Sequence, residues 1–512
     1  MKNFLILVFV QLMCIGSSAQ FTDRYWTFGD SSAIDFRNLS NPVAAESILR
    51  SRGSCVSICD SLGNLLCYAS TPHVDLWLNP GTYYFGYVVN KNHEIMEGGD
   101  TLAAAGWYQE MILVPDPGNN NRFYLFHAGI TTTPIPGFYY SVMDLSYNGG
   151  LGKVVQKNIQ LHNFPVSDGL AAVKHGNGRD WWIVFKPMGV SGPTDEIYEY
   201  LLTDQGLSSA FIKHVGIGTY SNGVQLEFSK QGNQLVLFDP DLNFELFYFD
   251  RCTGNIVTTN NVHLYNGSTP NYYWWSCVFS PNASKIYTTI IYDGLGDSLS
   301  YLVQYDLHAP DVFNSADTLY TFHKPVVAGL LQRGPDDKIY LSCSMEFNDC
   351  EFFYLYCDTS YFPENMNLGV INQPNNLGAA CDFQPFSFYL GGHRTYVGLP
   401  NNPDYELGPD TTSLCDTITS SLPVLPGQTT SPELHVFYHS SWEKVFLNAF
   451  PIRGKKYDLK LLDISGRLVY SEQGATDLPY FSKTLDTHLL KKGIYVVVVE
   501  TERERMVGRF VY

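Results

Sequence analysis

The sequence predicts an all-β protein, and three observations lead to that prediction. Tyr and Phe occur 35 and 32 times, and aromatic residues favour strands. Only 16% of the residues are charged, so long helices with charged outer faces are not expected. The 43 Gly and 27 Pro indicate many turns, and they lie between apolar runs in a pattern typical of β-hairpins.

The clearest hairpin pattern lies at residues 276–290. Val278 and Phe279 precede the turn sequence Ser-Pro-Asn-Ala-Ser, and a β-branched and aromatic run follows. The pattern predicts further hairpins at residues 53–68, 110–127, 170–185, 224–238 and 329–342. Successive copies begin roughly 50 residues apart, which is the period of propeller blades.

Each hairpin is followed by apolar segments that suit an outer pair of strands. A four-stranded sheet cannot bury both faces alone, whereas radial stacking of several sheets buries them. Six blades can be traced over residues 53–372, and a partial blade follows at residues 379–389. We expect a strand near Tyr25 to complete that blade. The prediction is a seven-bladed β-propeller, with six or eight blades as alternatives, followed by a small C-terminal β-sandwich.

Composition divides the chain into four predicted parts. Residues 1–19 read as a signal peptide, and residues 20–400 as the propeller. Residues 401–435 are rich in Pro, Ser, Thr and Gly, which predicts a flexible linker. Alternation of apolar and polar residues returns over residues 436–512, as expected for a β-sandwich.

The N-terminus has the order of a secretory signal. Lys2 precedes an apolar run that is too short to cross a bilayer, and the small residues Ser17 to Ala19 follow at the cleavage positions. A lipid anchor on Cys14 is the alternative. We expect no transmembrane helix in the mature chain, because no later segment is apolar for long enough.

Charge and cysteine content narrow the class of protein. The net charge of −18 argues against nucleic-acid binding, which needs clustered Lys and Arg. Cysteines in an exported chain predict disulfides, and we expect Cys252 and Cys277 to bridge neighbouring blades. The chain has no C-x-x-C pair, so the sequence does not indicate a tetrahedral zinc site.

The C-terminal part carries two sequence motifs in a specific order and spacing. They are Lys-Leu-Leu-Asp-Ile-Ser-Gly-Arg-Leu-Val-Tyr at residues 460–470 and Leu-Asp-Thr-His-Leu-Leu-Lys-Lys-Gly-Ile-Tyr at residues 485–495. This part resembles the type A C-terminal sorting domain of the type IX secretion system of Bacteroidota, with Gly466, Gly493 and Tyr495 as motif residues. The resemblance implies the type IX secretion machinery as a partner. It also implies export across the outer membrane, removal of the sorting domain, and release or attachment at the cell surface.

The larger N-terminal part also carries a resemblance. The motif Trp-Thr-Phe-Gly at residues 26–29 and the segments 149–152, 171–181 and 398–404 resemble propeller-like regions of large secreted Bacteroidota proteins. Many of those proteins are linked to gliding motility or cell-surface assembly. The resemblance implies a lineage and a fold, and it implies no agreed biochemical activity.

Clustered aromatic residues are the candidate ligand-binding residues. They are Trp181, Trp182, Tyr273, Trp274 and Trp275. Adjacent positions of a strand face opposite ways, so about half of these side chains belong in the core. The others could line a rim that stacks on the sugar rings of a glycan or on a surface protein.

Metal and catalytic motifs are incomplete in this sequence. Residues 239–245 space oxygen ligands like a calcium loop, but Phe244 replaces the required Gly and Asp250 the final Glu. We therefore expect no cofactor, with Ca²⁺ as the alternative, and no metal site or catalytic residue is predicted. The predicted function is that of an exported binding or structural module. The alternative is a secreted propeller enzyme, a lyase or glycosidase acting on polysaccharide.

Overall fold

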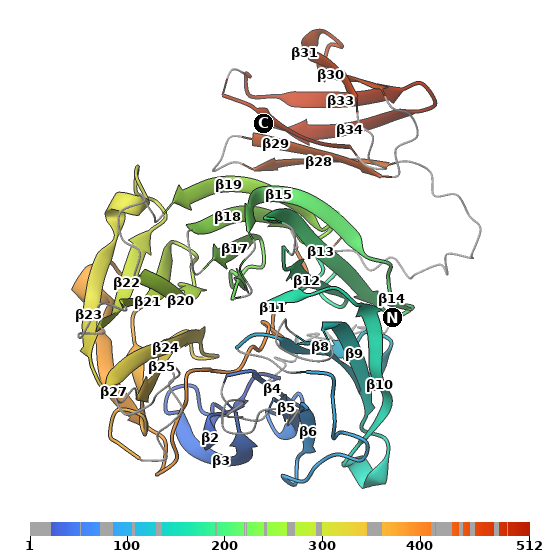
Figure 1. Ribbon diagram of the computed structural model, residues 1–512. Coiled ribbons are helices and arrows are strands. Elements are labelled where there is room, and N and C mark those ends of the chain that lie inside the picture. The colour runs from blue at the N-terminus through green and yellow to red at the C-terminus, as the bar shows by residue number, and fades with distance from the viewer. Residues whose placement is uncertain are drawn as a thin grey trace, which may run out of the picture. The chain divides into compact units, whose positions relative to one another are not determined.

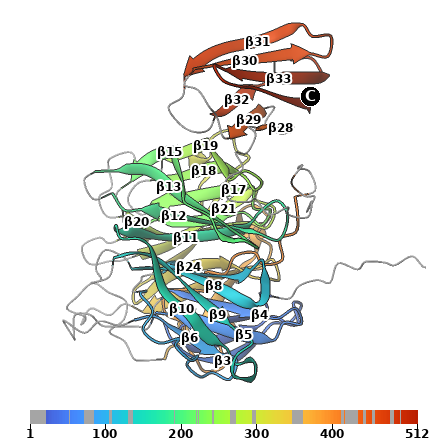
Figure 2. The same cartoon turned by 90° about the vertical axis from the view of Figure 1, so that its right-hand side faces the viewer.

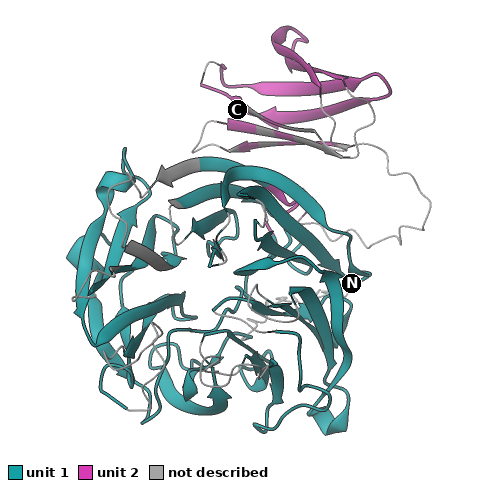
Figure 3. Ribbon diagram, viewed as in Figure 1, with its two compact units in different colours: residues 1–251, 256–409 teal, residues 252–255, 410–512 magenta. Residues whose placement is uncertain are grey.

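The structure is a computed structural model with two compact units, described here one by one (Figure 3). Unit 1 comprises residues 1–251 and 256–409, and unit 2 comprises residues 252–255 and 410–512. The residues that the structure describes are 22–51, 53–71, 85–104, 108–129, 136–189, 192–219, 221, 223–239, 243–263, 272–292, 299–345, 361–410, 415, 433–439, 444–450, 456–475, 481–488 and 490–512. No helix among them is long and apolar enough to span a membrane.

The described part of unit 1 forms seven antiparallel sheets that stand around a common centre (Figure 1). The first two are β1 (Tyr25–Phe28), β2 (Asp30–Asp35) and β3 (Val43–Arg50), then β4 (Cys55–Cys59), β5 (Leu65–Ser70) and β6 (Tyr87–Asn90). The third consists of β7 (Met111–Asp116), β8 (Asn119–Gly129), β9 (Gly137–Asp144) and β10 (Lys153–His162). The fourth consists of β11 (Val166–Lys174), β12 (Trp181–Pro187), β13 (Thr194–Thr203), β14 (Gly206–Leu207) and β15 (Phe211–Thr219).

The remaining three sheets of unit 1 have four strands each. They are β16 (Gln225–Phe228), β17 (Gln234–Asp239), β18 (Asn243–Asp250) and β19 (Asn255–His263) in the fifth sheet. The sixth contains β20 (Tyr272–Phe279), β21 (Lys285–Tyr292), β22 (Leu299–Asp306) and β23 (Asp317–His323). The seventh contains β24 (Val326–Arg333), β25 (Ile339–Met345), β26 (Asn367–Ile371) and β27 (Phe383–Tyr389). Three short 3₁₀ segments lie at Asn148–Gly150, Phe313–Ser315 and Gly378–Cys381.

The six predicted hairpins are confirmed as the first two strands of the second to seventh sheets. The turn between β20 and β21 shows why this sequence bends. The Ser280 N–H donates to the Lys285 carbonyl, and the Asn282 side-chain oxygen accepts from the Ser284 N–H. Ala283 takes a φ of 55° within this turn. The short polar residues around it favour tight turns because their side chains hydrogen-bond nearby backbone groups.

The predicted partial blade is wrong. Strand β27 is the fourth strand of the seventh sheet, where it pairs with β26, whereas β1 forms its own hairpin with β2. Gly29 permits that hairpin, because its φ of 60° is a left-handed conformation that favours glycine. The first and seventh sheets are neighbours through side chains, since Trp26 and Phe36 pack edge-on against Tyr340 of β25.

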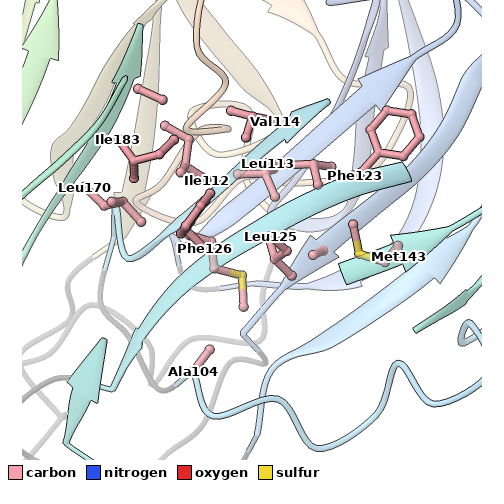
Figure 4. Packing of buried hydrophobic residues seen from close by; sticks show 14 of the residues in the cluster. Ala104, Ile112, Leu113, Val114, Phe123, Leu125, Phe126, Met143, Leu170 and Ile183 are labelled. Carbon is pink, nitrogen blue, oxygen red and sulfur yellow. The ribbon is translucent and has the colours of Figure 1, made fainter. Parts of the chain in front are cut away.

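Apolar side chains fill the space between neighbouring sheets. Figure 4 shows this packing where Ile112 of β7 and Phe126 of β8 lie close to Leu170 and Ile183 of the next sheet. The same cluster includes Phe138 of β9, whose ring is buried. Each sheet therefore buries its faces against its neighbours, as the radial stacking argument requires.

Residues 394–409, which we call the central segment, run past the first strands of several sheets. The Asn401 side-chain amide donates to the carbonyls of Gln109, Met111 and Leu170 over 3.3, 3.0 and 2.8 Å. The Tyr405 hydroxyl donates to the Leu113 carbonyl over 2.7 Å. The prediction that a flexible linker begins at residue 401 is therefore wrong for residues 401–409. Their polar composition resembles that of a linker, but their side chains satisfy buried backbone carbonyls of the inner strands.

Unit 2 contains two further sheets that appear as two layers in Figure 2. One consists of β28 (Glu433–His439), β29 (Lys444–Phe450) and β32 (Phe481–Asp486). The other has the order β31 (Leu468–Ala475), β30 (Lys456–Asp463), β33 (Ile494–Thr501) and β34 (Arg505–Val511). Val445 and Leu447 of the first sheet share a buried cluster with Leu459 and Val497 of the second, so the alternating strands bury one face each.

The disulfide of the described residues differs from the predicted one. Cys252 is bonded to Cys415, with their Cα atoms 5.8 Å apart, and the predicted Cys252–Cys277 bridge is wrong. Cys277 is a free, fully buried thiol on β20, in a cluster with Phe279 and Ile286. Cys277 lies on the first strand of the sixth sheet, whereas Cys252 lies in the turn between the last two strands of the fifth sheet, so the two thiols are held at different parts of their sheets.

Candidate functional site: a carboxyl-lined cavity in unit 1

The structure buries the predicted aromatic pair of β12. Trp181 and Trp182 are 1% and 3% exposed. The Trp182 indole N–H donates to the Arg251 carbonyl over 2.8 Å, and the Trp181 ring lies edge-on to Tyr405 at 5.9 Å. Both side chains therefore belong to the core and offer no open stacking surface. The side chains of the other predicted aromatic residues, Tyr273, Trp274 and Trp275, lie outside the described residues.

A cavity of about 320 Å³ lies where the inner hairpins turn. One wall consists of residues 401–404 and 406–408 of the central segment. The ends of β11, β16 and β24 and the turns after β16 and β24 form the rest of the wall, together with Asp23 and Ile112. The site is thus built from segments that are far apart in the sequence.

Most charged side chains around this cavity already have partners. Arg24 contacts Glu406 over 2.9 Å, and Arg333 lies 3.7 Å from Asp404. A third ion pair joins Lys230, in the turn after β16, to Asp337, in the turn after β24. These three pairs engage both cations of the lining, Lys230 and Arg333, and leave Asp23 and Glu227 without an ion pair among the described residues.

Glu227 has the fewest polar contacts of the carboxyl groups that line the cavity. It lies on β16, lines the cavity and makes no hydrogen bond or ion pair with any residue that the structure describes. Burial raises the pKa of the Glu227 carboxyl to about 7, and the positive charge of Arg333 opposes that rise. Glu227 is therefore ready to accept hydrogen bonds from a bound group.

Gln332 of β24 is the second polar side chain without a partner among the described residues. It is only 9% exposed, and it lines the same cavity. A buried amide normally has hydrogen-bond partners, so an unengaged amide at a cavity is available to a ligand.

Glu227 and Gln332 occupy the same register position in their hairpins. Each stands two residues before the first turn residue, which donates its N–H across the turn. The equivalent positions of three other hairpins are apolar, namely Ile58, Val173 and Val278. Our sequence reasoning missed both residues, although a polar residue in this otherwise apolar register position is a signal that comparison of the repeats could have found.

Asp23 is the third carboxyl of interest at the cavity. Its Oδ1 accepts from the Trp26 indole N–H over 3.0 Å and from the Asn402 amide over 2.8 Å. Burial raises the pKa of Asp23 to about 7, although these two hydrogen bonds lower it. Asp404 and Glu406 raise it further by charge repulsion.

A second pair of acids lies near the other end of β11, away from the cavity lining. Glu110 is fully buried and Asp168 is 3% exposed. The Asp168 Oδ1 accepts from the backbone N–H groups of Tyr108 and Gln109, each over 3.1 Å. Burial, followed by repulsion from Asp168, holds the pKa of Glu110 well above its usual range. This pair is sealed inside the protein.

The predicted calcium loop falls partly on residues outside those described, between β17 and β18. Among the described residues, no group of three or more His, Cys, Asp or Glu side chains could hold a metal ion.

The motif residues of the C-terminal part have clear structural roles. Gly466 has a φ of 83° in the turn between β30 and β31, where its N–H donates to the Asp463 carbonyl. Gly493 and Tyr512 exchange two backbone hydrogen bonds. The buried Tyr495 ring stacks on Phe510 at 5.3 Å, and its hydroxyl donates to the Lys491 carbonyl.

Comparison with protein families identifies the C-terminal part. Residues 443–512 match the family described as a secretion system C-terminal sorting domain. This match confirms the predicted sorting domain, which implies the type IX secretion machinery as a partner. No curated protein sequence matches the chain.

Solved structures resemble the chain only distantly. One is a protein from Lactobacillus plantarum, 10% identical, with 74% of this chain and 99% of the other covered and a TM-score of 0.42. The periplasmic gluconolactonase PpgL of Pseudomonas aeruginosa is also 10% identical, with coverages of 73% and 98% and a TM-score of 0.42. The β-propeller domain of Cps50 (Swd1) from Myceliophteria thermophila is 9% identical, with coverages of 62% and 92% and a TM-score of 0.34. Similarity at this level carries no argument about function.

Proposed function

We propose that this chain is a secreted β-propeller of seven blades that binds a ligand in the cavity at the turn ends of its inner hairpins. The type IX sorting domain supports the export part of this proposal. The binding part is carried by one observation, the presence of two unengaged polar side chains, Glu227 and Gln332, in one cavity. Ligand sites in proteins are concave and place a few convergent polar groups at such positions.

We propose that the protein acts at the outer cell surface or in the medium. The sorting domain directs export, and the larger unit 1 is the part that would act after export. Glycans and surface proteins are the ligand sources available there.

The binding proposal is tested with the full chain on glycan and peptide arrays. Glu227→Gln keeps the size of the side chain and removes its charge, and Glu46→Gln makes the same exchange at an exposed site on β3. We expect Glu227→Gln to weaken binding and Glu46→Gln to leave it unchanged. Equal binding by all three proteins would place the ligand elsewhere and refute the proposal.

A second candidate function is cleavage of a polysaccharide. Asp23 and Glu227 favour it, because they share a cavity and burial raises the pKa of each carboxyl to about 7, close to the range in which a carboxyl can donate or accept a proton at neutral pH. Incubation with a panel of polysaccharides, followed by measurement of new reducing ends, tests this alternative. Activity that is lost in both Asp23→Asn and Glu227→Gln would support cleavage, and the absence of any product would exclude it for the panel.

A further inference from the structure

The charges around the cavity define the kind of ligand that it can accept. Its lining holds five acidic residues, Asp23, Glu227, Asp337, Asp404 and Glu406, and two basic residues, Lys230 and Arg333. Lys230 and Arg333 are each paired with an acid, and Arg24 pairs with Glu406. Asp23 and Glu227 are the two lining acids without an ion pair among the described residues.

The two unengaged side chains add direction to this charge. Glu227 presents carboxyl oxygens, and Gln332 presents an amide oxygen as an acceptor from the equivalent position of β24. An ammonium group carries three donors and one positive charge, so its chemistry suits both kinds of acceptor and neutralises Glu227. Both cations of the described lining, Lys230 and Arg333, are paired with acids, so neither is available to an anionic ligand.

We infer that the cavity binds a ligand through a primary ammonium group, with Glu227 as its counter-ion and the Gln332 amide oxygen as a second acceptor. This inference rests on the proposed function. A cavity of about 320 Å³ corresponds to roughly ten water molecules of bulk volume, which admits an amino sugar or a lysine side chain. Both carry the same chemistry, and the probes below distinguish them.

Charge, and not only shape, is expected to determine the selectivity. A neutral ligand would give the Glu227 carboxyl no direct ionic partner, because Arg333 acts on it only through its charge and is paired with Asp404. An acidic ligand would be repelled by Glu227 and Asp23. The ion pair between Lys230 and Asp337 is partly exposed, with side chains 39% and 49% accessible, so it leaves the chemistry of the deeper acceptors unchanged.

Calorimetric titration of the full chain with matched probes tests the inference. Glucosamine and the amide of Nα-acetyllysine carry the ammonium group. N-acetylglucosamine and the amide of Nα-acetylnorleucine are their neutral counterparts, and glucuronate is the acidic probe. We expect an ammonium probe to bind at least about tenfold more tightly than its neutral counterpart, and glucuronate not to bind. The preferred ammonium probe identifies a sugar or a lysine source.

Two variants connect the result to the cavity. Glu227→Gln should weaken binding of the ammonium probe by about tenfold or more, and Gln332→Leu by about threefold. Glu46→Gln, on an outer strand, should change nothing. Circular dichroism and melting temperatures of the variants show that they fold, and because Glu227→Gln preserves volume, it remains informative if Gln332→Leu fails to fold.

The outcomes separate this inference from the proposed function. Equal affinity for a neutral probe and its ammonium counterpart, weakened by Gln332→Leu, would overturn the ammonium inference and leave the binding function standing. Binding that neither cavity variant weakens, or the absence of binding by every probe, would overturn both.

Discussion

The two ends of strand β11 present carboxyl groups in opposite settings. At one end Ala171, Ala172 and Val173 line a cavity that Glu227 and Asp23 also face. Near the other end Asp168 is sealed against Glu110 and the backbone of residues 108 and 109. Both settings raise the pKa of a carboxyl, so a raised pKa by itself does not indicate a ligand site. The difference that matters is access: the open carboxyls can meet a ligand, and the sealed pair can only contribute to the fold.

The largest expected effect comes from removing the sealed acceptor. Asp168→Ala leaves the N–H groups of Tyr108 and Gln109 buried without their acceptor, which should destabilise the fold by about 3 kcal/mol. Asp168→Asn is the matched control, because it keeps the acceptor oxygen and removes the charge beside Glu110, so it should cost less than about 1 kcal/mol. Urea denaturation of both variants measures the difference. Equal losses in the two variants would show that charge, and not the acceptor, matters at this end.

A somewhat smaller effect is expected where the central segment meets the inner strands. Asn401→Ala removes the donor to three buried carbonyls and should lower the free energy of unfolding by about 2 kcal/mol. Asn92→Ala, at an exposed turn, should stay within about 0.5 kcal/mol. A similar small loss for Asn401→Ala would mean that the central segment is not held by this amide.

A third sealed acid gives a pH-dependent test. Glu199 is fully buried, and neither carboxyl oxygen accepts a hydrogen bond, although Lys213 lies 3.8 Å away. Burial raises the pKa of Glu199 to about 8, above its value of about 4.3 in an unfolded chain. The folded state therefore holds the proton more tightly, so its contribution to stability is complete below about pH 4 and is lost as the pH rises through 8.

Glu199→Gln removes this titration. Relative to the wild type, the variant should gain stability with rising pH, by about 4 to 5 kcal/mol between pH 4.5 and pH 9. Denaturation midpoints at the two pH values measure the gain. A constant difference at both values would contradict the raised pKa.

The smallest effect is expected at the open end. The partly exposed pair of Lys230 and Asp337 should contribute less than about 1 kcal/mol, and its contribution should shrink in high salt. A double-mutant cycle with Lys230→Met and Asp337→Asn, at low and high salt, measures this coupling. A coupling above about 2 kcal/mol that survives salt would show that the cavity end is as tightly built as the sealed end.

The sequence predicts the local structure of this protein better than its long-range contacts. The turn at residues 280–285 and the other hairpins follow from residues close in the chain, so they could be predicted. The roles of β27 and β1 could not, because apolar strands of equal quality can pair with several neighbours. The cavity wall formed by the central segment could not be predicted either, because its composition is typical of linkers. Only tertiary contacts distinguish a buried Asn from an exposed one. Trp181 was a candidate because clustered aromatic residues can line a binding surface. The structure buries its side chain, which excludes it as a ligand-binding residue.

The central segment also determines when unit 1 can finish folding. Arg24 pairs with Glu406 across 382 positions of sequence, and Asn402 contacts Ser57 across 345. A polypeptide leaves the ribosome N-terminus first, so these early residues wait for their partners until almost the whole unit has been synthesised. Contacts of such sequence separation slow folding, because a long loop must close before they form. The central segment is therefore expected to be among the last parts of unit 1 to reach its native contacts, whereas the hairpins, whose strands are close in sequence, can form earlier.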